Sequence, residues 1–150
     1  MVTSICECVA RFVGCSLRCI RVKTIEEIAK SLPNGFHDSS ILGVRLDYVQ
    51  RTAEIDIELW FSSPDEVDQE KYRRATLFIS ELIYFVIEPP GHPNISHGEA
   101  SLVDGGSSEV ESISRLPNTL PSGGFTYWFF VSSWNCFIHV AALGAEIVVL

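Results

Sequence analysis

His37 and Asp38 are the pair of neighbouring residues most suggestive of chemistry in this sequence. A histidine held by a carboxylate is a common acid–base dyad, and loops are where functional side chains concentrate. Neighbouring residues of an extended strand point to opposite faces, so the dyad forms only if the backbone turns there. The sequence favours a structural alternative, in which Asp38 accepts hydrogen bonds from the amides of Ser39 and Ser40. His37 would then pack beside Phe36 and bond a backbone carbonyl.

His92, His97 and Glu99 follow the spacing H-x4-H-x-E, which could ligate zinc and leave one coordination position open. The segment contains proline and glycine, so this spacing does not fix the ligand geometry, and the sequence specifies no fourth ligand. A solvated loop is the favoured alternative. We therefore predict no metal site and no other cofactor.

Cysteines supply the other candidate chemistry. Cys136 precedes His139 by three residues, which suggests a nucleophile and its base. On one strand, however, residues three apart face opposite ways, and Cys136 falls on the apolar side, where a thiolate is disfavoured. We expect a packed thiol. Four more cysteines in C-x-C-x6-C-x3-C spacing match no common zinc motif and are expected to act as small hydrophobic residues: Cys6, Cys8, Cys15 and Cys19.

The composition limits the classes of partner that this protein can bind. The 150 residues are 47% hydrophobic and carry a net charge of −8, which opposes phosphate backbones and argues against nucleic-acid binding. The charge is uneven, because four bases and Glu7 give the first 23 residues +3, so the remaining seven bases and 18 acids give the rest −11. An acidic body suits a basic protein partner. The apolar content suggests that some surface is covered by a second copy, in a dimer.

The chain contains no uninterrupted apolar run close to the roughly 20 residues of a membrane span. Glu7 and Arg11 interrupt the first apolar stretch, unlike a secretory signal, and the odd cysteine count does not resemble a disulfide framework. We expect a cytoplasmic location. Residues 1–22 are predicted to be an extension with the pattern of an amphipathic helix, and residues 23–150 a single domain. A basic helix lying on lipid is a less favoured alternative for the extension.

The clearest structural pattern in the sequence is that of residues 35–61, which have the two-residue alternation of an antiparallel hairpin. With Gln50 and Arg51 as the turn, one face is wholly apolar. This register predicts the apolar pairs Tyr48 with Ala53, Leu46 with Ile55, Val44 with Ile57 and Leu42 with Leu59. On the opposite face it predicts Arg45 with Asp56 and Asp47 with Glu54.

Further elements follow from capping residues and alternation. The sequence predicts a helix over 24–32, a strand-forming stretch over 72–88 with a bend or bulge near Ser80 and Glu81, a short strand over 99–104 and a helical turn near 108–113. An acidic loop separates the hairpin from residue 72. The C-terminal third is predicted to form a meander of strands 125–131, 134–142 and 146–150, with its first turn at Ser132 and Ser133.

One face of that meander is rich in large rings for a surface that would otherwise meet water. Its residues are Thr126, Trp128, Phe130, Asn135, Phe137 and His139. We expect something to cover this face, and four of these residues are the predicted binding residues: Trp128, Phe130, Asn135 and His139.

The strings LPNGFHDSSI, YFVIEPPGHP, VDGG and WNCFIHVAA all lie within residues 31–148. Over this range the chain resembles small bacterial proteins that share a domain of unknown function. Those proteins carry a Gly-Phe-His-Asp-Ala/Ser start, a Pro-Pro after a hydrophobic strand and a Trp-Asn-Ser-Phe-Ile ending. Cys136 stands where they usually have serine, and the N-terminal extension departs from them. Size, acidity and β-rich build also resemble the immunity proteins of bacterial toxin systems, which implies a protein partner.

The predicted fold is α+β and mainly antiparallel β, a curled sheet or sandwich of about six strands with one or two short helices. The predicted function is non-enzymatic binding of another protein, of immunity or accessory type. The alternative is a small hydrolase or metal-dependent enzyme that would use His37, Asp38, His92 and His97.

Overall fold

The structure, a computed structural model, describes residues 22–61, 71–89, 91, 100–107 and 119–150. Its elements are α1 (Ile25–Ser31), β1 (Ser39–Asp47), β2 (Thr52–Trp60), β3 (Tyr72–Ser80), β4 (Tyr84–Ile87), β5 (Ala100–Gly106), β6 (Phe125–Val131), the 3-10 turn η2 (Ser132–Trp134), β7 (Cys136–Ala142) and β8 (Gly144–Val149). The eight strands pair in the order β4-β7-β6-β5-β1-β2-β3-β8. An α+β fold built mainly from antiparallel strands is thus confirmed, with more strands than predicted.

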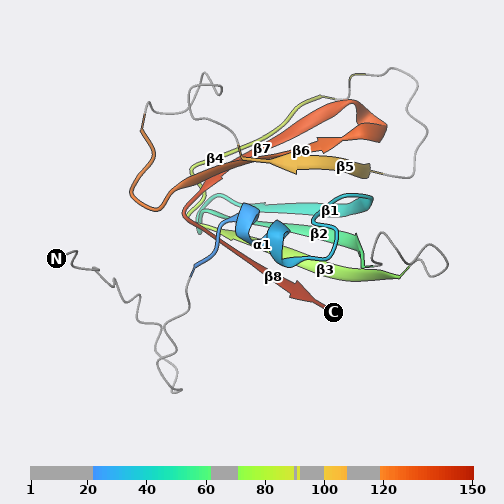
Figure 1. The fold of residues 1–150 in the computed structure, drawn as a ribbon. Helices are drawn as coiled ribbons and strands as arrows, with labels where there is room; N and C mark the ends of the chain where they lie inside the picture. The colour runs from blue at the N-terminus through green and yellow to red at the C-terminus, as the bar shows by residue number, and fades with distance from the viewer. Residues whose placement is uncertain (1–21, 62–70, 90, 92–99, 108–118) are drawn as a thin grey trace, which may run out of the picture.

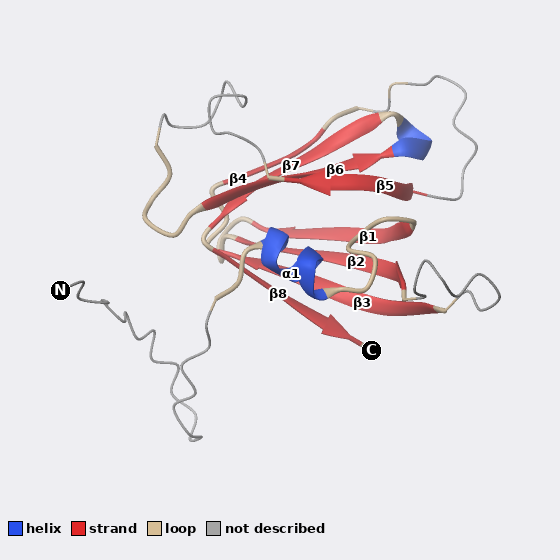
Figure 2. Cartoon of the chain, in the orientation of Figure 1, coloured by secondary structure: helices blue, strands red, loops and turns tan. Residues whose placement is uncertain are grey.

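The sheet is bent into two layers. Figure 1 shows β4, β7, β6 and β5 in one layer, here called the β6 layer, and β1, β2, β3 and β8 in the other, here called the β2 layer. Figure 2 shows how little helix accompanies them. The layers are joined where β5 pairs with the first residues of β1, with Ser39 opposite Leu102 and Ile41 opposite Ala100. The predicted short strand 99–104 is therefore the link between the two layers.

Helix α1 begins as predicted. Thr24 Oγ1 accepts a hydrogen bond from the Glu27 amide at 3.1 Å, and Glu27 Oε2 accepts one from the Thr24 amide at 2.9 Å. These two bonds satisfy amides that the first helical turn leaves unpaired. Ile25 and Ile28 are buried. Because a helix of seven residues is unstable by itself, this apolar contact with the sheet is what keeps α1 in place.

The β1–β2 hairpin keeps its predicted faces but not its predicted register. Arg45 lies opposite Glu54 and Leu46 opposite Ala53, two residues away from the expected pairs. Because side chains alternate with a period of two, a shift of two residues leaves every side chain on its own face. The inward residues of β2 are accordingly buried, as expected: Ala53, Ile55, Ile57 and Leu59.

The shift comes from the turn, which spans four residues between Asp47 and Thr52 in place of the expected two. Asp47 Oδ1 accepts hydrogen bonds from the amides of Val49 and Gln50, both at 2.9 Å, and so favours the longer turn. The prediction that Tyr48 joins the apolar face is wrong, because it lies in this turn and is 85% exposed.

A second departure lies at the start of β1, where the register shifts between Ile41 and Gly43. Such a bulge places one extra residue on one strand and turns its side chain away from the ladder. Leu42 is that residue. It was expected opposite Leu59 in the core, but its side chain is half-exposed.

Residues 72–88 bend where the sequence predicted. β3 ends at Ser80, Glu81 adopts a positive φ of 50°, and β4 starts at Tyr84. The bend carries the chain from the β2 layer, where β3 pairs with β2, to the β6 layer, where β4 pairs with β7. Ile87 was expected to serve the core and is instead 42% exposed, because it lies at the end of β4, a short edge strand.

The β6–β7 hairpin also keeps its faces and changes its register by two residues. Phe129 pairs with Ile138 and Val131 with Cys136. The reason is again the turn, because η2 and Asn135 replace the two-residue tip expected at Ser132 and Ser133. The buried face is the predicted one: Tyr127, Phe129, Val131, Cys136, Ile138 and Val140.

β8 is the edge strand that the sequence predicted, but its neighbour is β3 and not β7. The chain therefore crosses from the β6 layer to the β2 layer at Leu143. Gly144 is required at the crossing, because a Cβ at this position would collide with the side chain of Val22. The three-stranded meander predicted for the C-terminal third is wrong for this reason.

One core lies between the layers and receives side chains from both. Phe36, between α1 and β1, makes edge-on contacts with Tyr127 at 6.3 Å and Phe129 at 5.3 Å between ring centroids. The Phe of the Gly-Phe-His-Asp string thus ties the two layers together. The extension 1–21, the acidic loop 62–70 and the helical turn predicted near 108–113 lie outside the described residues. The predicted division into an extension and a single domain 23–150 therefore stays a prediction.

Candidate functional site

The outer face of β6 and β7 carries four aromatic side chains that point away from the core. Trp128 pairs with His139 and Phe130 with Phe137 across the two strands. They alternate with buried residues such as Phe129 and Ile138, because successive strand residues face opposite sides. We call Trp128, Phe130, Phe137 and His139 the aromatic patch.

Phe137 is the centre of the patch. Its ring centroid lies 5.7 Å from that of Trp128, 5.0 Å from that of Phe130 and 5.8 Å from that of His139. The planes of Trp128 and Phe137 meet at 75°, the edge-to-face geometry that aromatic pairs prefer. Phe137 is also 36% exposed. The patch is therefore a packed group of rings that still offers one ring to a partner.

Gly106 on β5 extends the patch to a third strand. It pairs with Trp128, and a Cβ at Gly106 would lie 3.1 Å from the six-membered ring of the indole. The missing side chain lets the indole lie against the β5 backbone. Trp128 is thus fixed from both sides, by Gly106 and by the Phe137 ring.

Glu88 places a carboxylate beside the rings. Its Oε1 lies 3.3 Å from His139 Nε2, and its Oε2 accepts a hydrogen bond from the Phe137 amide at 3.0 Å. The Glu88 amide in turn donates to the Phe137 carbonyl at 3.0 Å. Nδ1 of His139 is buried and has no partner among the residues that the structure describes. The patch therefore combines aromatic faces with one anchored and partly exposed anion.

Cys136 is separated from the patch by the thickness of the sheet. It is buried in the core, where burial foremost, and then the charge of Glu88, raises the pKa of its thiol. A raised pKa leaves the thiol protonated at neutral pH and unreactive as a nucleophile. Cys136 and His139 do face opposite sides, as predicted, and do not form a nucleophile–base pair.

Asn135, the fourth predicted binding residue, lies at the hairpin end and outside the ring contacts. Its backbone is left-handed (φ 47°, ψ 50°), and its amide donates to the Ser132 carbonyl at 3.2 Å. Gly91 packs directly against it, since a Cβ on Gly91 would lie 2.9 Å from the Asn135 carbonyl oxygen. Asn135 therefore shapes the turn. Asparagine tolerates this left-handed backbone conformation better than most residues do.

The His37–Asp38 pair does come together, because the backbone turns there. Asp38 has a φ of 55°, and its Oδ2 lies 2.7 Å from His37 Nδ1. Both side chains are about half-exposed. Asp38 was expected to accept from the amides of Ser39 and Ser40, but the Ser39 amide donates to the Phe36 carbonyl. Asn34 completes the turn, as its side-chain amide donates to the His37 carbonyl at 3.3 Å.

The remaining candidates for metal binding, which are His92, His97, Glu99 and the four early cysteines, fall outside the described residues. Within the described part of the chain, no three His, Cys, Asp or Glu side chains gather closely enough to hold a metal ion.

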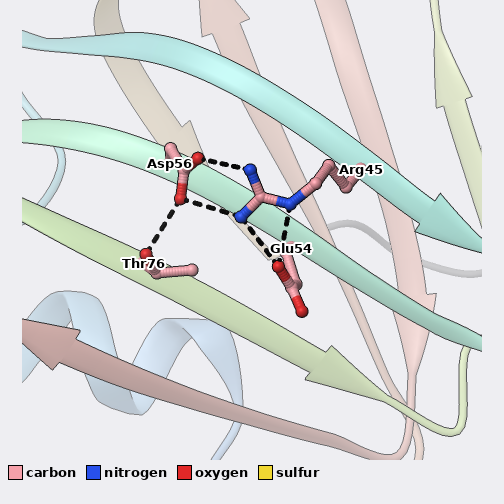
Figure 3. A network of polar contacts seen from close by, with 4 residues as sticks. All are labelled: Arg45, Glu54, Asp56 and Thr76. Atoms are coloured by element: carbon pink, nitrogen blue, oxygen red, sulfur yellow. Dashed lines mark hydrogen bonds and ion pairs between the residues drawn. The ribbon is translucent and has the colours of Figure 1, made fainter.

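The outer face of the β2 layer differs from the aromatic patch, because it carries charged side chains that pair with one another. Figure 3 shows Arg45 between two carboxylates. Its guanidinium donates to Asp56 at 2.8 Å and to Glu54 at 2.7 Å, and the Thr76 hydroxyl donates to Asp56 at 2.9 Å. The hydrogen bond from Arg45, and then that from Thr76, lowers the pKa of Asp56. Arg45, Glu54, Asp56 and Thr76 thus form a solvated polar network on this face.

Sequence reasoning missed two members of the site. Phe137 appeared among the outward residues of the late hairpin but not among the predicted binding residues, although alternation alone places it on the same face of its strand as His139. Glu88 carried no signal, because nothing in the sequence pairs β4 with β7.

No described helix is long and apolar enough to cross a membrane. Comparisons with family models, with curated proteins and with solved structures yielded no match to this chain.

Proposed function

We propose that this protein is a non-enzymatic binding module, of immunity or accessory type, which holds a basic protein partner on the aromatic patch. The observation that carries the proposal is the packed group of Trp128, Phe130, Phe137 and His139 on the outside of the sheet, with the Glu88 carboxylate beside it. Aromatic side chains at a protein surface are the residues most often responsible for binding energy.

The chemistry of the patch favours a cationic partner. Ring faces attract ammonium and guanidinium groups, and a neighbouring carboxylate adds a charge-assisted hydrogen bond. The net charge of −8 steers a basic protein toward the molecule and repels an acidic one. The rings are also held by contacts with one another, so little side-chain freedom is lost when a partner binds.

The proposal includes a bacterial cytoplasmic location, in line with the resemblance to small bacterial proteins. It also includes a homodimer as a separate expectation, which rests on the apolar composition and which light scattering on the purified chain would test.

The test is affinity capture followed by measurement with the purified partner. The tagged chain is expected to capture a basic protein from the cytoplasmic extract of its host, and calorimetry then gives the dissociation constant of the pair. Phe137→Ala should weaken binding by about tenfold or more, since truncation of a central aromatic residue commonly costs over about 1 kcal/mol. The affinity should also fall as salt is raised.

Phe78→Ala is the matched control. Phe78 lies on the outer face of β3 and is 38% exposed, against 36% for Phe137, so the two truncations remove the same ring at similar exposure. Binding that weakens equally in both variants, or a partner without a basic surface, would contradict the proposal. Circular dichroism establishes that both variants keep the sheet.

A small hydrolase or metal-dependent enzyme is the second candidate, because His37 and Asp38 lie 2.7 Å apart at the surface. In this alternative Asp38 orients the His37 ring as a base or ligand, together with His92 and His97. Elemental analysis of the purified full chain decides this point. Stoichiometric zinc that is lost in His37→Ala would support the enzyme, whereas a metal-free protein that binds its basic partner would reject it.

A further inference from the structure

The His139 ring lies beside the carboxylate of Glu88. Its Nε2 is 3.3 Å from Oε1 of that residue, which directly follows β4. The neighbouring strands add no other charge at this point, since His139 pairs with Val86 on β4 and with Trp128 on β6. Tyr84, the remaining titratable residue of β4, carries no charge at neutral pH. Among the described residues of β4, β6 and their adjoining turns, Glu88 is therefore the one charged group that faces His139.

The two ring nitrogens of His139 have different surroundings. Nε2 faces the Glu88 carboxylate, whereas Nδ1 is buried and has no hydrogen-bond partner within the described part of the chain. A neutral imidazole carries one proton, and a proton on Nε2 is donated toward Glu88. A proton on Nδ1 would instead leave a buried N–H without an acceptor and turn the lone pair of Nε2 toward an anion. The surroundings therefore select the neutral form of His139 that carries its proton on Nε2.

We propose that His139 makes the affinity of the aromatic patch for its cationic partner depend on pH, because protonated His139 competes with the partner for Glu88. This inference rests on the proposed function and adds its regulation. Beside neutral His139, the Glu88 carboxylate keeps its negative charge for an ammonium or guanidinium group of the partner. Protonated His139 forms an ion pair with that carboxylate, and the two charges offset each other.

The position of His139 within the patch strengthens this competition. Its ring centroid lies 5.8 Å from that of Phe137, the ring that the patch offers to a partner. A proton on His139 therefore places a positive charge beside the incoming cation, and like charges repel. The coupling is reciprocal, since a cation bound at Glu88 opposes the protonation of His139 by the same free energy. The patch should thus hold its partner at neutral pH and release it in mild acid.

Calorimetry with hexaarginine as the cationic probe tests the inference, because arginine keeps its charge at every pH used. For the unmodified full chain, the dissociation constant is expected to rise by about threefold or more between about pH 7.5 and about pH 5.5. His139→Gln keeps a donor toward Glu88 but takes up no proton, so its dissociation constant should be the same at both pH values. His37→Gln is the matched control and should keep the pH dependence, because His37 also lies beside a carboxylate, with its Nδ1 2.7 Å from Asp38 Oδ2.

NMR of the imidazole nitrogens in the free chain adds a readout that needs no partner, since neutral His139 should carry its proton on Nε2. A proton on Nδ1 would overturn the inference. An equal pH dependence in the unmodified chain and in His139→Gln would also overturn it, while leaving the proposed function in place. Glu88→Gln, which removes the other half of the pair, should likewise bind equally at both pH values. Absence of hexaarginine binding at neutral pH, or equal binding by Phe137→Ala, would contradict the proposed function and this inference with it.

Discussion

Glu88 contacts β7 with both carboxylate oxygens, one against His139 Nε2 and one on the Phe137 amide. At the scale of single residues, these two contacts hold a carboxylate beside the rings of the aromatic patch. Arg45 shows a different arrangement, since its guanidinium is paired with the two carboxylates of Glu54 and Asp56 in its own layer. The Arg45 guanidinium is therefore already paired within the β2 layer, whereas the Glu88 carboxylate lies beside the rings of the aromatic patch.

Ile57→Asp is expected to unfold the domain. Ile57 is fully buried between the layers, where an unpaired carboxylate costs several kcal/mol, a large part of the stability of an ordinary domain. Thermal denaturation followed by circular dichroism should show no cooperative transition. Glu58→Gln, the outward neighbour, is the control and should melt like the unmodified protein. A normal melting temperature for Ile57→Asp would contradict the assignment of faces.

Asp56 should make stability depend on pH. The hydrogen bond from Arg45 lowers its folded-state pKa, so the contact stabilises the fold above the unfolded pKa of about 3.9 and is lost as pH falls through the folded value. Asp56→Asn should therefore be slightly less stable than the unmodified protein at pH 7. Urea titrations should show this difference shrinking as pH falls below the unfolded pKa and vanishing once pH is below the lowered folded-state pKa of Asp56. A difference that persists there would mean that the carboxylate charge is not its cause.

At the scale of elements, the length of each turn set the register of its hairpin, which the alternation within the strands could not determine. The Asp47 side chain lengthens the β1–β2 turn, and η2 with Asn135 lengthens the β6–β7 turn. Each changes its hairpin register by two residues relative to the shortest possible tip. Because the change is even in both hairpins, the buried faces are unaffected, and the aromatic patch remains on the outer face.

Asn135→Val is expected to destabilise the protein by about 1–2 kcal/mol. Its φ of 47° is left-handed, which a β-branched residue adopts only at such a cost. Asn135→Gly should be close to neutral, because glycine adopts this conformation freely. Urea denaturation of the two variants measures the difference. Equal stabilities would show that backbone conformation at residue 135 does not hold this turn.

At the scale of the whole molecule, the chain passes repeatedly between two layers and encloses one core. β3 continues into β4 in the other layer, β7 continues into β8, and β5 pairs with β1. These crossings make the layers depend on each other, since neither could bury Phe36, Tyr127 and Phe129 alone. Unfolding should therefore be a single cooperative event.

Removal of residues 1–20 is expected to leave this fold intact. The described core begins at Ile25 and draws all its members from later residues. The shortened chain should keep its sheet signal in circular dichroism and shift its melting temperature by a few degrees at most. Loss of that signal, or insolubility at every protein concentration, would show that the extension belongs to the core.

The sequence by itself determined which faces of the strands are buried. Alternation, the capping residues of α1 and the break near Glu81 were readable because each depends on neighbours only a few residues apart. Leu42, Leu46 and Tyr48 are exceptions. A one-residue bulge turns Leu42 outward without leaving a local signal, Leu46 is 36% exposed near the end of β1, and Tyr48 lies in the turn.

Only the tertiary structure decided which strands are neighbours. That β8 joins β3, that β4 joins β7 and that β5 links the layers depends on contacts between residues far apart in sequence, where several pairings satisfy the same alternation. In the candidate site, too, one part was predictable from the sequence and another depended on the tertiary structure. The outward rings of β6 and β7 were predictable from their two-residue spacing, whereas Glu88 reaches His139 only because the sheet bends and brings a distant edge strand beside β7.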